Sequence, residues 1–199
     1  QYVPYGTPIG EIEAVVERQN DRAGYTFEGW YTDGNHQNPF DGIMPAVDVN
    51  TEEPDAWNDG FKIYGKWTPV LSEYRVEHYQ QNPFDPSSYI LVEEETKTAL
   101  TDTEVTPEVK SYPGFQSPQA QNLWVTGDDG ACKQYYYHRN SYPLTYVKNN
   151  GEADGTADVM YGAAISEVPK YSGHAFAGWY EDAALTVSFE GKTMPMHAL

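Results

Sequence analysis

Apolar and polar residues alternate along most of the chain, and this period of two is typical of strands with one buried face. Tyr, Thr, Val and Trp fill many of these positions, and all four are favoured in strands. The clearest alternating stretches are residues 25–31, 63–67, 74–79, 88–92, 96–105 (with one break) and 131–138. The pattern therefore predicts a mainly β chain.

One stretch near the start follows a helical period instead. Pro8 precedes it and Gly24 lies beyond it, and both are suitable helix boundaries. Four apolar residues fall on one face of such a helix, with charged residues around them: Ile9, Ile12, Val15 and Val16. We expect one short helix near residues 9–20, which makes the fold class α+β with β structure dominant.

The chain contains an internal repeat. Residues 24–31, Gly-Tyr-Thr-Phe-Glu-Gly-Trp-Tyr, return 149 positions later as residues 173–180, Gly-His-Ala-Phe-Ala-Gly-Trp-Tyr. Landmarks that recur in the same order along the chain predict two copies of one small unit. Three further landmarks follow the same order in both copies: Tyr5-Gly6 with Tyr161-Gly162, Phe40-Asp41-Gly42 with Phe189-Glu190-Gly191, and Met44-Pro45 with Met194-Pro195.

A different stretch separates the copies, so we expect three units, residues 1–68, 69–139 and 140–199. The first copy has a closing strand at residues 61–67 that the second lacks, and the second has an opening strand at 142–147 that the first lacks. We therefore expect the chain to be a window from a longer tandem array. Each end unit should expose a strand edge that is weakly ordered or pairs with another chain.

The net charge of the chain argues against two classes of function, nucleic-acid binding and membrane binding. The chain has 30 acidic and 12 basic residues among 199, which gives a formal charge of -18. No basic stripe is available to displace the counterions of a nucleic acid, and the same charge opposes binding to an anionic membrane surface. No apolar run approaches the roughly 18 residues of a membrane span. We expect no nucleic-acid partner and no direct membrane insertion.

The sequence offers little catalytic chemistry. The single cysteine, Cys132, excludes a disulfide within the chain and a cysteine zinc cluster. The Asp-Gly sequences at 129–130 and 154–155 are ordinary turns rather than calcium loops. Five histidines have neither metal-ligand spacing nor a catalytic motif: His36, His78, His138, His174 and His197. The prediction is a non-enzymatic protein with no catalytic, cofactor-binding or metal-binding residues.

Aromatic residues make up 15% of the chain, and we expect them to divide into two groups. Those at repeated positions, Phe27 with Phe176 and Trp30 with Trp179, should form the buried core of each copy. Other aromatic residues answer to no repeat position and are therefore candidates for ligand contacts. These are Trp57, Trp124, Tyr135 and Tyr137.

The repeated landmarks, together with Ile63-Tyr64-Gly65-Lys66-Trp67, resemble the Listeria–Bacteroides repeat, the B repeat of internalin-type surface proteins. Residues 1–68 and 140–199 both look like members, although residues 51–60 form an insertion that the family usually lacks. The middle stretch, with Tyr-Arg-Val-Glu-His-Tyr at 74–79, resembles the mucin-binding-protein-like (MucBP-type) repeats that alternate with B repeats.

The resemblance implies a fold of tandem, small β-grasp-like units, related to ubiquitin, on bacterial cell-surface proteins. Such proteins are usually secreted and often wall-anchored, and they serve in adhesion or as stalks. We therefore expect an extracellular repeat segment that acts as a stalk or spacer and contributes to adhesion, with neighbouring repeats as partners. The alternative is a module that binds a host receptor or a glycan through exposed aromatic residues. Short linkers near 68–72 and 139–142, stiffened by Pro69 and Pro143, should join the units.

Overall fold

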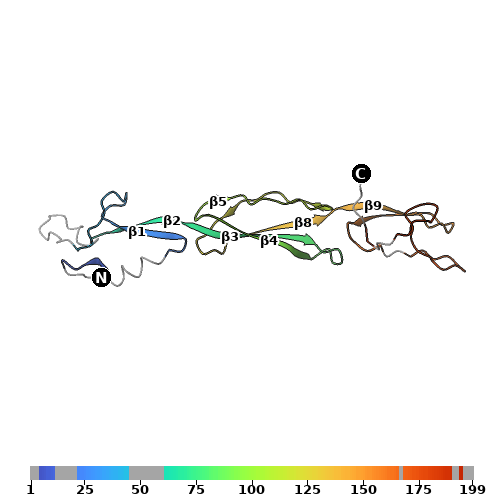
Figure 1. Ribbon diagram of the computed structural model, residues 1–199, viewed down its shortest axis with the longest axis horizontal. Helices are drawn as coiled ribbons and strands as arrows, with labels where there is room; N and C mark the ends of the chain where they lie inside the picture. Colours follow the sequence, from blue (N-terminus) through green and yellow to red (C-terminus); the bar gives the residue numbers. More distant parts are fainter. Residues whose placement is uncertain (1–4, 12–21, 45–60, 166–167, 190–192, 195–199) are drawn as a thin grey trace, which may run out of the picture. The chain divides into compact units, whose positions relative to one another are not determined.

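The computed structural model describes residues 5–11, 22–44, 61–165, 168–189 and 193–194. This part of the chain is mainly β, as predicted, with almost no helix. The described part of the predicted helix is a single 3-10 turn, η1 (Ile9–Glu11), and the rest of that prediction lies outside the described residues. The strands are shown in Figure 1.

The first repeat contains an antiparallel pair of strands, β1 (Tyr25–Tyr31) and β2 (Tyr64–Pro69). The register aligns Phe27 with Trp67 and Trp30 with Gly65. It shifts between Phe27 and Gly29, where a bulge places one extra residue in β1. Gly29 has a φ of 136°, a conformation that only glycine adopts without strain.

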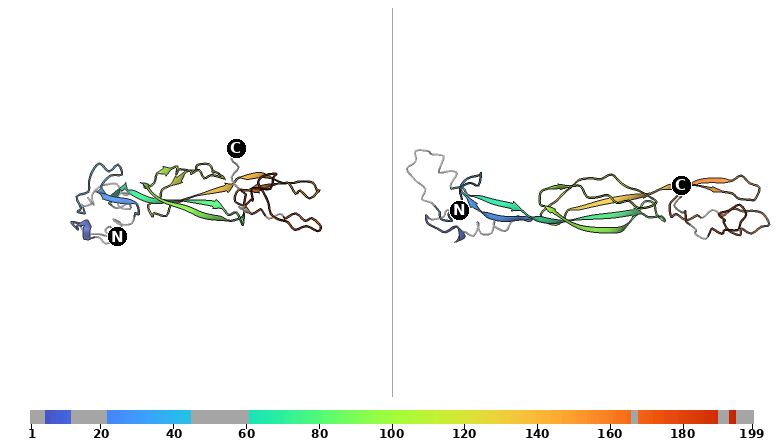
Figure 2. Two further views of the ribbon diagram at one scale, coloured as in Figure 1. Left: turned by 45° about the vertical axis from the view of Figure 1, so that its right-hand side comes forward. Right: turned by 45° about the horizontal axis from the view of Figure 1, so that its top comes forward.

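The middle stretch forms a sheet of four strands in the order β4-β3-β8-β6. Figure 2 shows its three long strands, β3, β4 and β8, running side by side. A separate small pair joins β5 (Glu104–Val105) to β7 (Leu123–Trp124). The strands of the larger sheet are β3 (Leu71–Gln81), β4 (Tyr89–Leu100), β6 (Phe115–Gln116) and β8 (Cys132–Arg139).

The second repeat begins with a hairpin of β9 (Ser141–Tyr146) and β10 (Gly155–Met160). This hairpin includes the predicted opening strand. The segment that matches β1 of the first repeat, residues 174–180, forms isolated bridges at its two ends and no strand between them. The second repeat therefore has the opening strand in place and, within the described residues, no pairing partner along 175–179.

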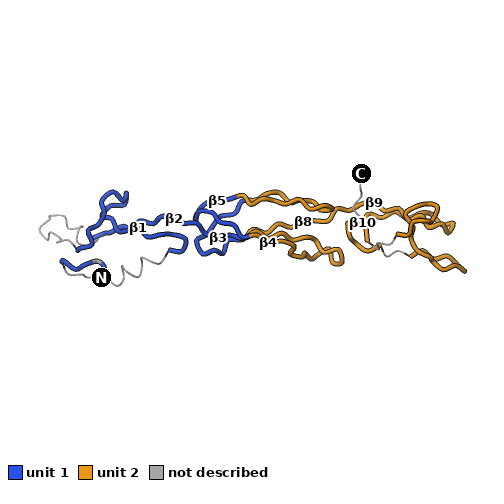
Figure 3. The backbone as a smooth tube through the Cα atoms, in the orientation of Figure 1, with its two compact units in different colours: residues 1–75, 96–105, 122–132 blue, residues 76–95, 106–121, 133–199 orange. Residues whose placement is uncertain are grey.

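The chain divides into two compact units, which are coloured separately in Figure 3. One comprises residues 1–75, 96–105 and 122–132, and Val125 is the most buried side chain among its described residues. The other comprises residues 76–95, 106–121 and 133–199. In the second unit the fully buried side chains are Val76, His78, Tyr135 and Tyr137. Because the division runs through β3, β4 and β8, it does not test the predicted boundaries at 68/69 and 139/140.

The two repeats form corresponding backbone hydrogen bonds. Trp30 O accepts from the N–H of Phe40 at 2.8 Å, and Trp179 O accepts from the N–H of Phe189 at 2.9 Å. The rings of Phe27 and Trp30 lie 5.1 Å apart at 62°, and the matching pair in the second repeat lies 5.1 Å apart at 64°. The equivalence predicted from the sequence landmarks is confirmed at these positions.

The prediction that these four aromatic residues form a buried core is wrong, because none of them is fully buried. Phe27, Trp30 and Trp179 are half-buried, and Phe176 is 40% exposed. The difference has a simple cause, because Trp67 of β2 packs edge-on against Phe27 with ring centroids 5.0 Å apart. No described residue covers Phe176 in the same way, since the second repeat has no counterpart of β2 among the described strands.

Candidate junction contacts and aromatic groove

A single residue, Val70, separates β2 of the first repeat from β3 of the middle sheet. Its N–H donates to the carbonyl oxygen of Gly24 in the first repeat at 2.9 Å. Its own carbonyl accepts from the N–H and the hydroxyl of Thr101, both at 2.9 Å. Both backbone groups of the linker residue are therefore used, one toward each neighbour.

The same junction brings a turn of the first repeat against a loop of the middle stretch. Tyr25 donates a hydrogen bond to the carboxylate of Asp102, and Arg22 lies 3.5 Å from the same carboxylate. The Arg22 guanidinium also lies 3.5 Å from the centre of the Tyr25 ring, which is cation–π geometry. The hydrogen bond to Asp102 raises the pKa of Tyr25, because it stabilises the protonated phenol.

The other junction has the same design with different residues. Asn140 alone separates β8 from β9, and its N–H donates to Gly114 O at 2.9 Å while its carbonyl accepts from Tyr161 N–H at 2.8 Å.

The guanidinium group of Arg139 joins two backbone carbonyls at this junction, and we call this arrangement the guanidinium clamp. Its Nε donates to Gln81 O at 2.6 Å and its Nη1 donates to Tyr161 O at 3.0 Å. Its guanidinium lies 4.7 Å from the ring centre of Phe115. Burial lowers the pKa of Arg139, which still leaves it charged at neutral pH.

A polar cluster lies inside the second compact unit, around the fully buried His78. The Tyr137 hydroxyl accepts from the backbone N–H of Lys110 at 2.9 Å and lies 2.8 Å from His78 Nδ1. A hydroxyl has one proton to donate and two lone pairs, so the imidazole tautomer decides which partner donates between Tyr137 and His78. The Tyr137 hydroxyl thus joins the backbone of Lys110 to the buried imidazole.

Lys110 extends this cluster toward two carboxylates. It forms ion pairs with Glu93 and Glu95, and Tyr112 donates to Glu93 at 2.9 Å. The hydrogen bonds to both glutamates raise the pKa of Lys110, and the bond from Lys110 lowers the pKa of Glu93. Burial and the Glu93 carboxylate raise the pKa of Tyr112 to about 12. These pKa shifts favour a protonated Lys110 and an ionised Glu93. Lys110 is therefore an ion-pair partner, because only an unprotonated lysine is a nucleophile.

Strand alternation decides which tyrosines of β8 are accessible. Tyr135 and Tyr137, which were expected as ligand contacts, are 2% and 0% exposed and present no ring face at the surface. Tyr136, between them, is 41% exposed and stacks on Tyr79 with ring centroids 5.1 Å apart. Tyr89 packs edge-on against Tyr136 at 5.0 Å and against His138 at 5.7 Å. The outer face of the sheet therefore carries an aromatic cluster. The sequence analysis assigned it to Tyr135 and Tyr137, whereas the accessible tyrosine of β8 is Tyr136, between them.

The two other predicted contact residues have different outcomes. Trp124 is 55% exposed and stays a candidate, whereas Trp57 lies outside the described residues. Within the residues that the structure covers, no group of three or more His, Cys, Asp and Glu side chains could hold a metal ion. His36 and His174 pack against Tyr31 and Tyr171, and His197 is not described.

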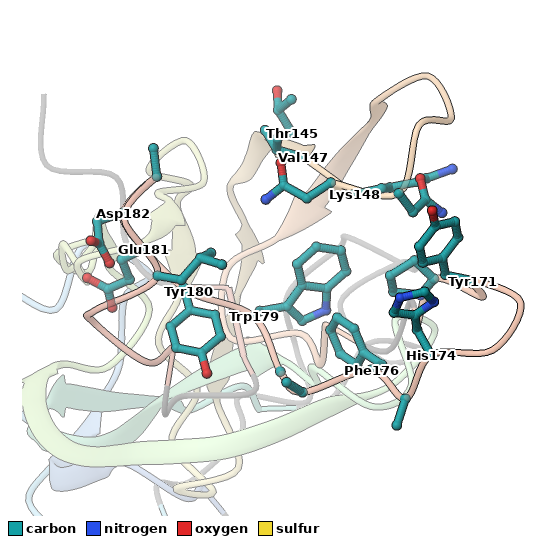
Figure 4. A pocket seen from close by; sticks show the side chains of 18 residues that line it. Thr145, Val147, Lys148, Tyr171, His174, Phe176, Trp179, Tyr180, Glu181 and Asp182 are labelled. Carbon is teal, nitrogen blue, oxygen red and sulfur yellow. The ribbon is translucent and has the colours of Figure 1, made fainter.

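An aromatic groove of about 520 Å³ lies in the second repeat, between the end of β9 and residues 171–182. Figure 4 shows Trp179 and Phe176 inside it, with Thr145 and Val147 on one side and the stacked rings of Tyr171 and His174 at one end. Tyr146, which is buried, packs on Trp179 at 5.2 Å. No motif in the sequence pointed to a groove at this place.

Comparison with known proteins identifies the repeated units. Residues 1–50 and 142–198, more than half of the chain, match the family described as the Listeria-Bacteroides repeat domain. The chain belongs to this repeat family. Both junctions and the groove thus involve Listeria–Bacteroides repeats, and the matched ranges leave out the whole middle stretch and the strand β2.

Two proteins of Evansella cellulosilytica (strain ATCC 21833 / DSM 2522) are similar over 94% of the chain. One is named "Putative Gly-rich membrane protein" and is 27% identical, and the other is named "Putative membrane protein" and is 24% identical. The chain spans only 22% and 28% of their lengths. No solved structure matches the chain. Within the described residues, no helix is both long enough and apolar enough to cross a bilayer.

Proposed function

We propose that this chain is a non-enzymatic spacer segment of a bacterial cell-surface protein. In this proposal Listeria–Bacteroides repeats flank a MucBP-type unit, each unit has a β-grasp-like fold, and the whole protein is extracellular and wall-anchored. The observation that carries the proposal is the use of single linker residues, Val70 and Asn140, whose N–H and C=O groups both form hydrogen bonds. The names of the two relatives agree with a location at the cell envelope.

A linker of one residue suits a spacer for a physical reason. A flexible linker lets neighbouring units reorient freely, whereas a residue fixed through both backbone groups cannot rotate without breaking hydrogen bonds. The formal charge of -18 adds mutual repulsion, which favours a solvated surface and opposes collapse onto other segments. A segment with these properties keeps whatever it carries away from the surface to which it is attached.

Small-angle scattering tests the spacer role. We would insert a four-residue Gly-Ser segment on each side of Val70 in one variant and of Asn140 in another, and compare each with the unaltered chain. The expected result is a broader distribution of interatomic distances and a smaller maximum dimension in both variants. The matched control carries the same insertion at Asn149, in the turn between β9 and β10. Identical scattering from all four proteins would contradict the spacer proposal.

The aromatic cluster on the outer face of the middle sheet supports a second candidate function, the binding of a host-surface protein or a glycan. Tyr136 is exposed and packs against the half-buried rings of Tyr79 and Tyr89, and aromatic rings are suitable platforms for sugar rings. A glycan array and a pull-down from host-cell extracts would test it. Saturable binding that Tyr136→Ala abolishes, and that Trp124→Ala leaves unchanged, would support a binding module centred on this cluster.

A further inference from the structure

We propose that the middle sheet resists mechanical tension, because its neighbouring strands β3 and β8 are loaded in shear when the chain is pulled lengthwise. In shear, all the bonds between two strands are strained together, whereas in peeling they break one after another. Such resistance matters only in a spacer that links two attached bodies, so this role rests on the proposed function. It gives the middle stretch a task that the flanking repeats do not share.

The chain enters and leaves the sheet through these two strands. Val70 leads directly into β3, and Asn140 follows directly after β8. The strand order β4-β3-β8-β6 makes β3 and β8 hydrogen-bonded neighbours. Both connecting residues are held by backbone hydrogen bonds, as described above. Force along the chain therefore reaches the start of β3 and the end of β8 through one fixed residue at each side.

Contacts within the second compact unit show that β3 and β8 are parallel. Three residues of β3 contact residues that lie 57 or 58 positions later in β8. The pairs are Glu77 with Gln134, Tyr79 with Tyr136, and Gln81 with Arg139. A nearly constant separation means that both strands advance in the same direction, whereas in an antiparallel pair it would fall steadily. Pulling β3 backward and β8 forward therefore slides one strand along the other.

Side chains join the two strands on both faces of this pair, and we call residues 76–81 and 133–139 the seam. On the buried face, the Tyr137 hydroxyl lies 2.8 Å from Nδ1 of the fully buried His78. On the outer face, Gln134 Nε2 donates to the buried carboxylate of Glu77 at 2.8 Å. These bonds cross the seam, so a slide of one residue would break all of them in a single step.

The end of β8, where the force leaves the sheet, has a doubled connection to β3. The backbone N–H of Arg139 donates to the side-chain oxygen of Gln81 at 2.9 Å, and Nε of the guanidinium clamp donates to Gln81 O at 2.6 Å. Hydrogen bonds from a charged donor are stronger than those between neutral groups. The residue that is pulled is thus fixed directly to the last residue of the neighbouring strand.

The hairpin of the second repeat has the opposite geometry. Its strands β9 and β10 are antiparallel, and Ser141 at the start of β9 pairs with Met160 at the end of β10. The chain therefore enters and leaves this hairpin at the same end, so tension opens it one pair at a time. We expect the hairpin to unfold at low force while the middle sheet stays folded.

Single-molecule force spectroscopy of the whole chain tests this role through two pulling directions. One version is held at its two ends, so that force enters through β3 and leaves through β8. The other is held at Ser87→Cys, in the exposed turn between β3 and β4, and at its C-terminal end. This second direction separates the ends of β3 and β8 by peeling. Both versions carry Cys132→Ser, which removes the native thiol.

The middle sheet should open at a force at least about twofold higher in the end-to-end direction, because forced unfolding depends on the barrier along the pulling direction. The length gained identifies the event, since residues 71–139 extend to roughly 230–250 Å and residues 88–139 to roughly 170–190 Å. Equal forces in the two directions would overturn the proposal. Opening of the sheet before the hairpin of the second repeat would also overturn it.

Two tyrosine variants make the result specific to the seam. Tyr137→Phe removes the hydroxyl that contacts His78 across the seam, so the end-to-end force should fall. Tyr112→Phe removes a hydroxyl that donates to Glu93 of β4, outside the seam, so the force should stay the same. An equal fall in force for both variants would overturn the assignment of the resistance to the seam.

The force experiment and the scattering experiment fail in different ways. Scattering reports whether Val70 and Asn140 hold the neighbouring segments at rest, whereas the difference between pulling directions depends on the seam alone. Identical scattering from all proteins with a strong dependence on direction would contradict the spacer proposal and support the shear-loaded seam. The expected scattering with equal forces would keep the spacer proposal and overturn the resistance to tension.

Discussion

Gly24 and Gly127 lie so close together that a β-carbon added to Gly127 would stand 2.8 Å from the α-carbon of Gly24. This approach brings the 22–25 turn of the first repeat against the loop that leads into β8. We predict that Gly127→Ala forces the two segments apart and destabilises the chain by about 1–3 kcal/mol, the usual cost of overpacking.

Tyrosine titration measures the loss of this contact directly. The pKa of Tyr25 is raised by its hydrogen bond to Asp102, so it should fall toward the ordinary value in Gly127→Ala. The control is Gly130→Ala in the same loop, where the nearest atoms are the movable carboxylate oxygens of Asp128 at 3.3 and 3.4 Å. An unchanged Tyr25 titration in Gly127→Ala would show that the close approach is not rigid.

Arg139 should be the most sensitive basic residue at the other junction. Arg139→Lys keeps the charge but cannot donate to Gln81 O and Tyr161 O at once from one planar group. We expect a loss of about 1.5–3 kcal/mol in the free energy of unfolding, the range for hydrogen bonds to charged groups. Urea denaturation checks this, with Lys148→Arg as a control on the second repeat. Equal stability of the two variants would mean that the guanidinium clamp contributes nothing.

Neighbouring tyrosines of β8 should differ sharply when their hydroxyls are removed. Tyr137→Phe leaves the backbone N–H of Lys110 and Nδ1 of His78 without the group that joins them, which costs about 1–3 kcal/mol for buried polar atoms. Tyr136→Phe removes a hydroxyl that bonds only exposed Gln134, so stability should change by less than about 0.5 kcal/mol. Thermal unfolding of the pair distinguishes these outcomes, and the reverse order would mean that the phase of β8 is wrong.

Leu185 is strained, because a leucine with a φ of 55° is in the left-handed region. This conformation costs roughly 1–2 kcal/mol for a residue with a β-carbon, whereas the flexibility of glycine costs roughly 0.5–1 kcal/mol. The side chain is 51% exposed, so Leu185→Gly should stabilise the second repeat by about 0.5–1 kcal/mol. The equivalent His36→Gly should gain less, since it removes the ring contact with Tyr31. Chemical denaturation of both variants would rank them.

Acid should destabilise the fold through turn carboxylates. The pKa of Asp33 is lowered mainly by the N–H of Asn38, and that of Asp182 mainly by the Thr186 hydroxyl. A carboxyl whose pKa is lower in the folded chain stabilises it above the unfolded pKa, about 3.9, and loses that contribution as pH falls through the folded pKa. Stability should therefore drop below about pH 4, as urea midpoints would show. Asp182→Asn should flatten that drop, and an unchanged slope would contradict the assignment.

The strands were the part of the fold that the sequence predicted best. Residues 25–31 form β1, and the break predicted within 96–105 falls between the end of β4 at Leu100 and the start of β5 at Glu104. The phase of β8 could not be predicted in the same way. Three consecutive tyrosines, 135–137, give no alternation from which to read the buried face, so packing around His78 decides it.

The contacts between each repeat and the middle stretch were also beyond sequence analysis. Residues 68–72 and 139–142 were expected to be linkers stiffened by proline, yet Pro69 ends β2 and Pro143 lies inside β9. The hydrogen bonds that fix Val70 and Asn140 come from residues distant along the chain, and Gly127 looks like any turn glycine. The repeat landmark Tyr161-Gly162 was visible as a repeated position, but its contact with Arg139 was not.

The loops that follow β1 and its counterpart owe their shape to one carboxylate each. Asp33 accepts from the N–H groups of Gln37 and Asn38, and Asp182 accepts from those of Thr186 and Val187. All six residues between this aspartate and the following phenylalanine differ between the two loops. Thr186 adds its hydroxyl to the bonds of Asp182, but the acceptor bonds that the two loops share are to backbone N–H groups, which any residue except proline supplies. The intervening positions can therefore diversify by mutation while the loop keeps these bonds. Each repeat can therefore vary the chemistry of its exposed loop while both copies keep the same framework.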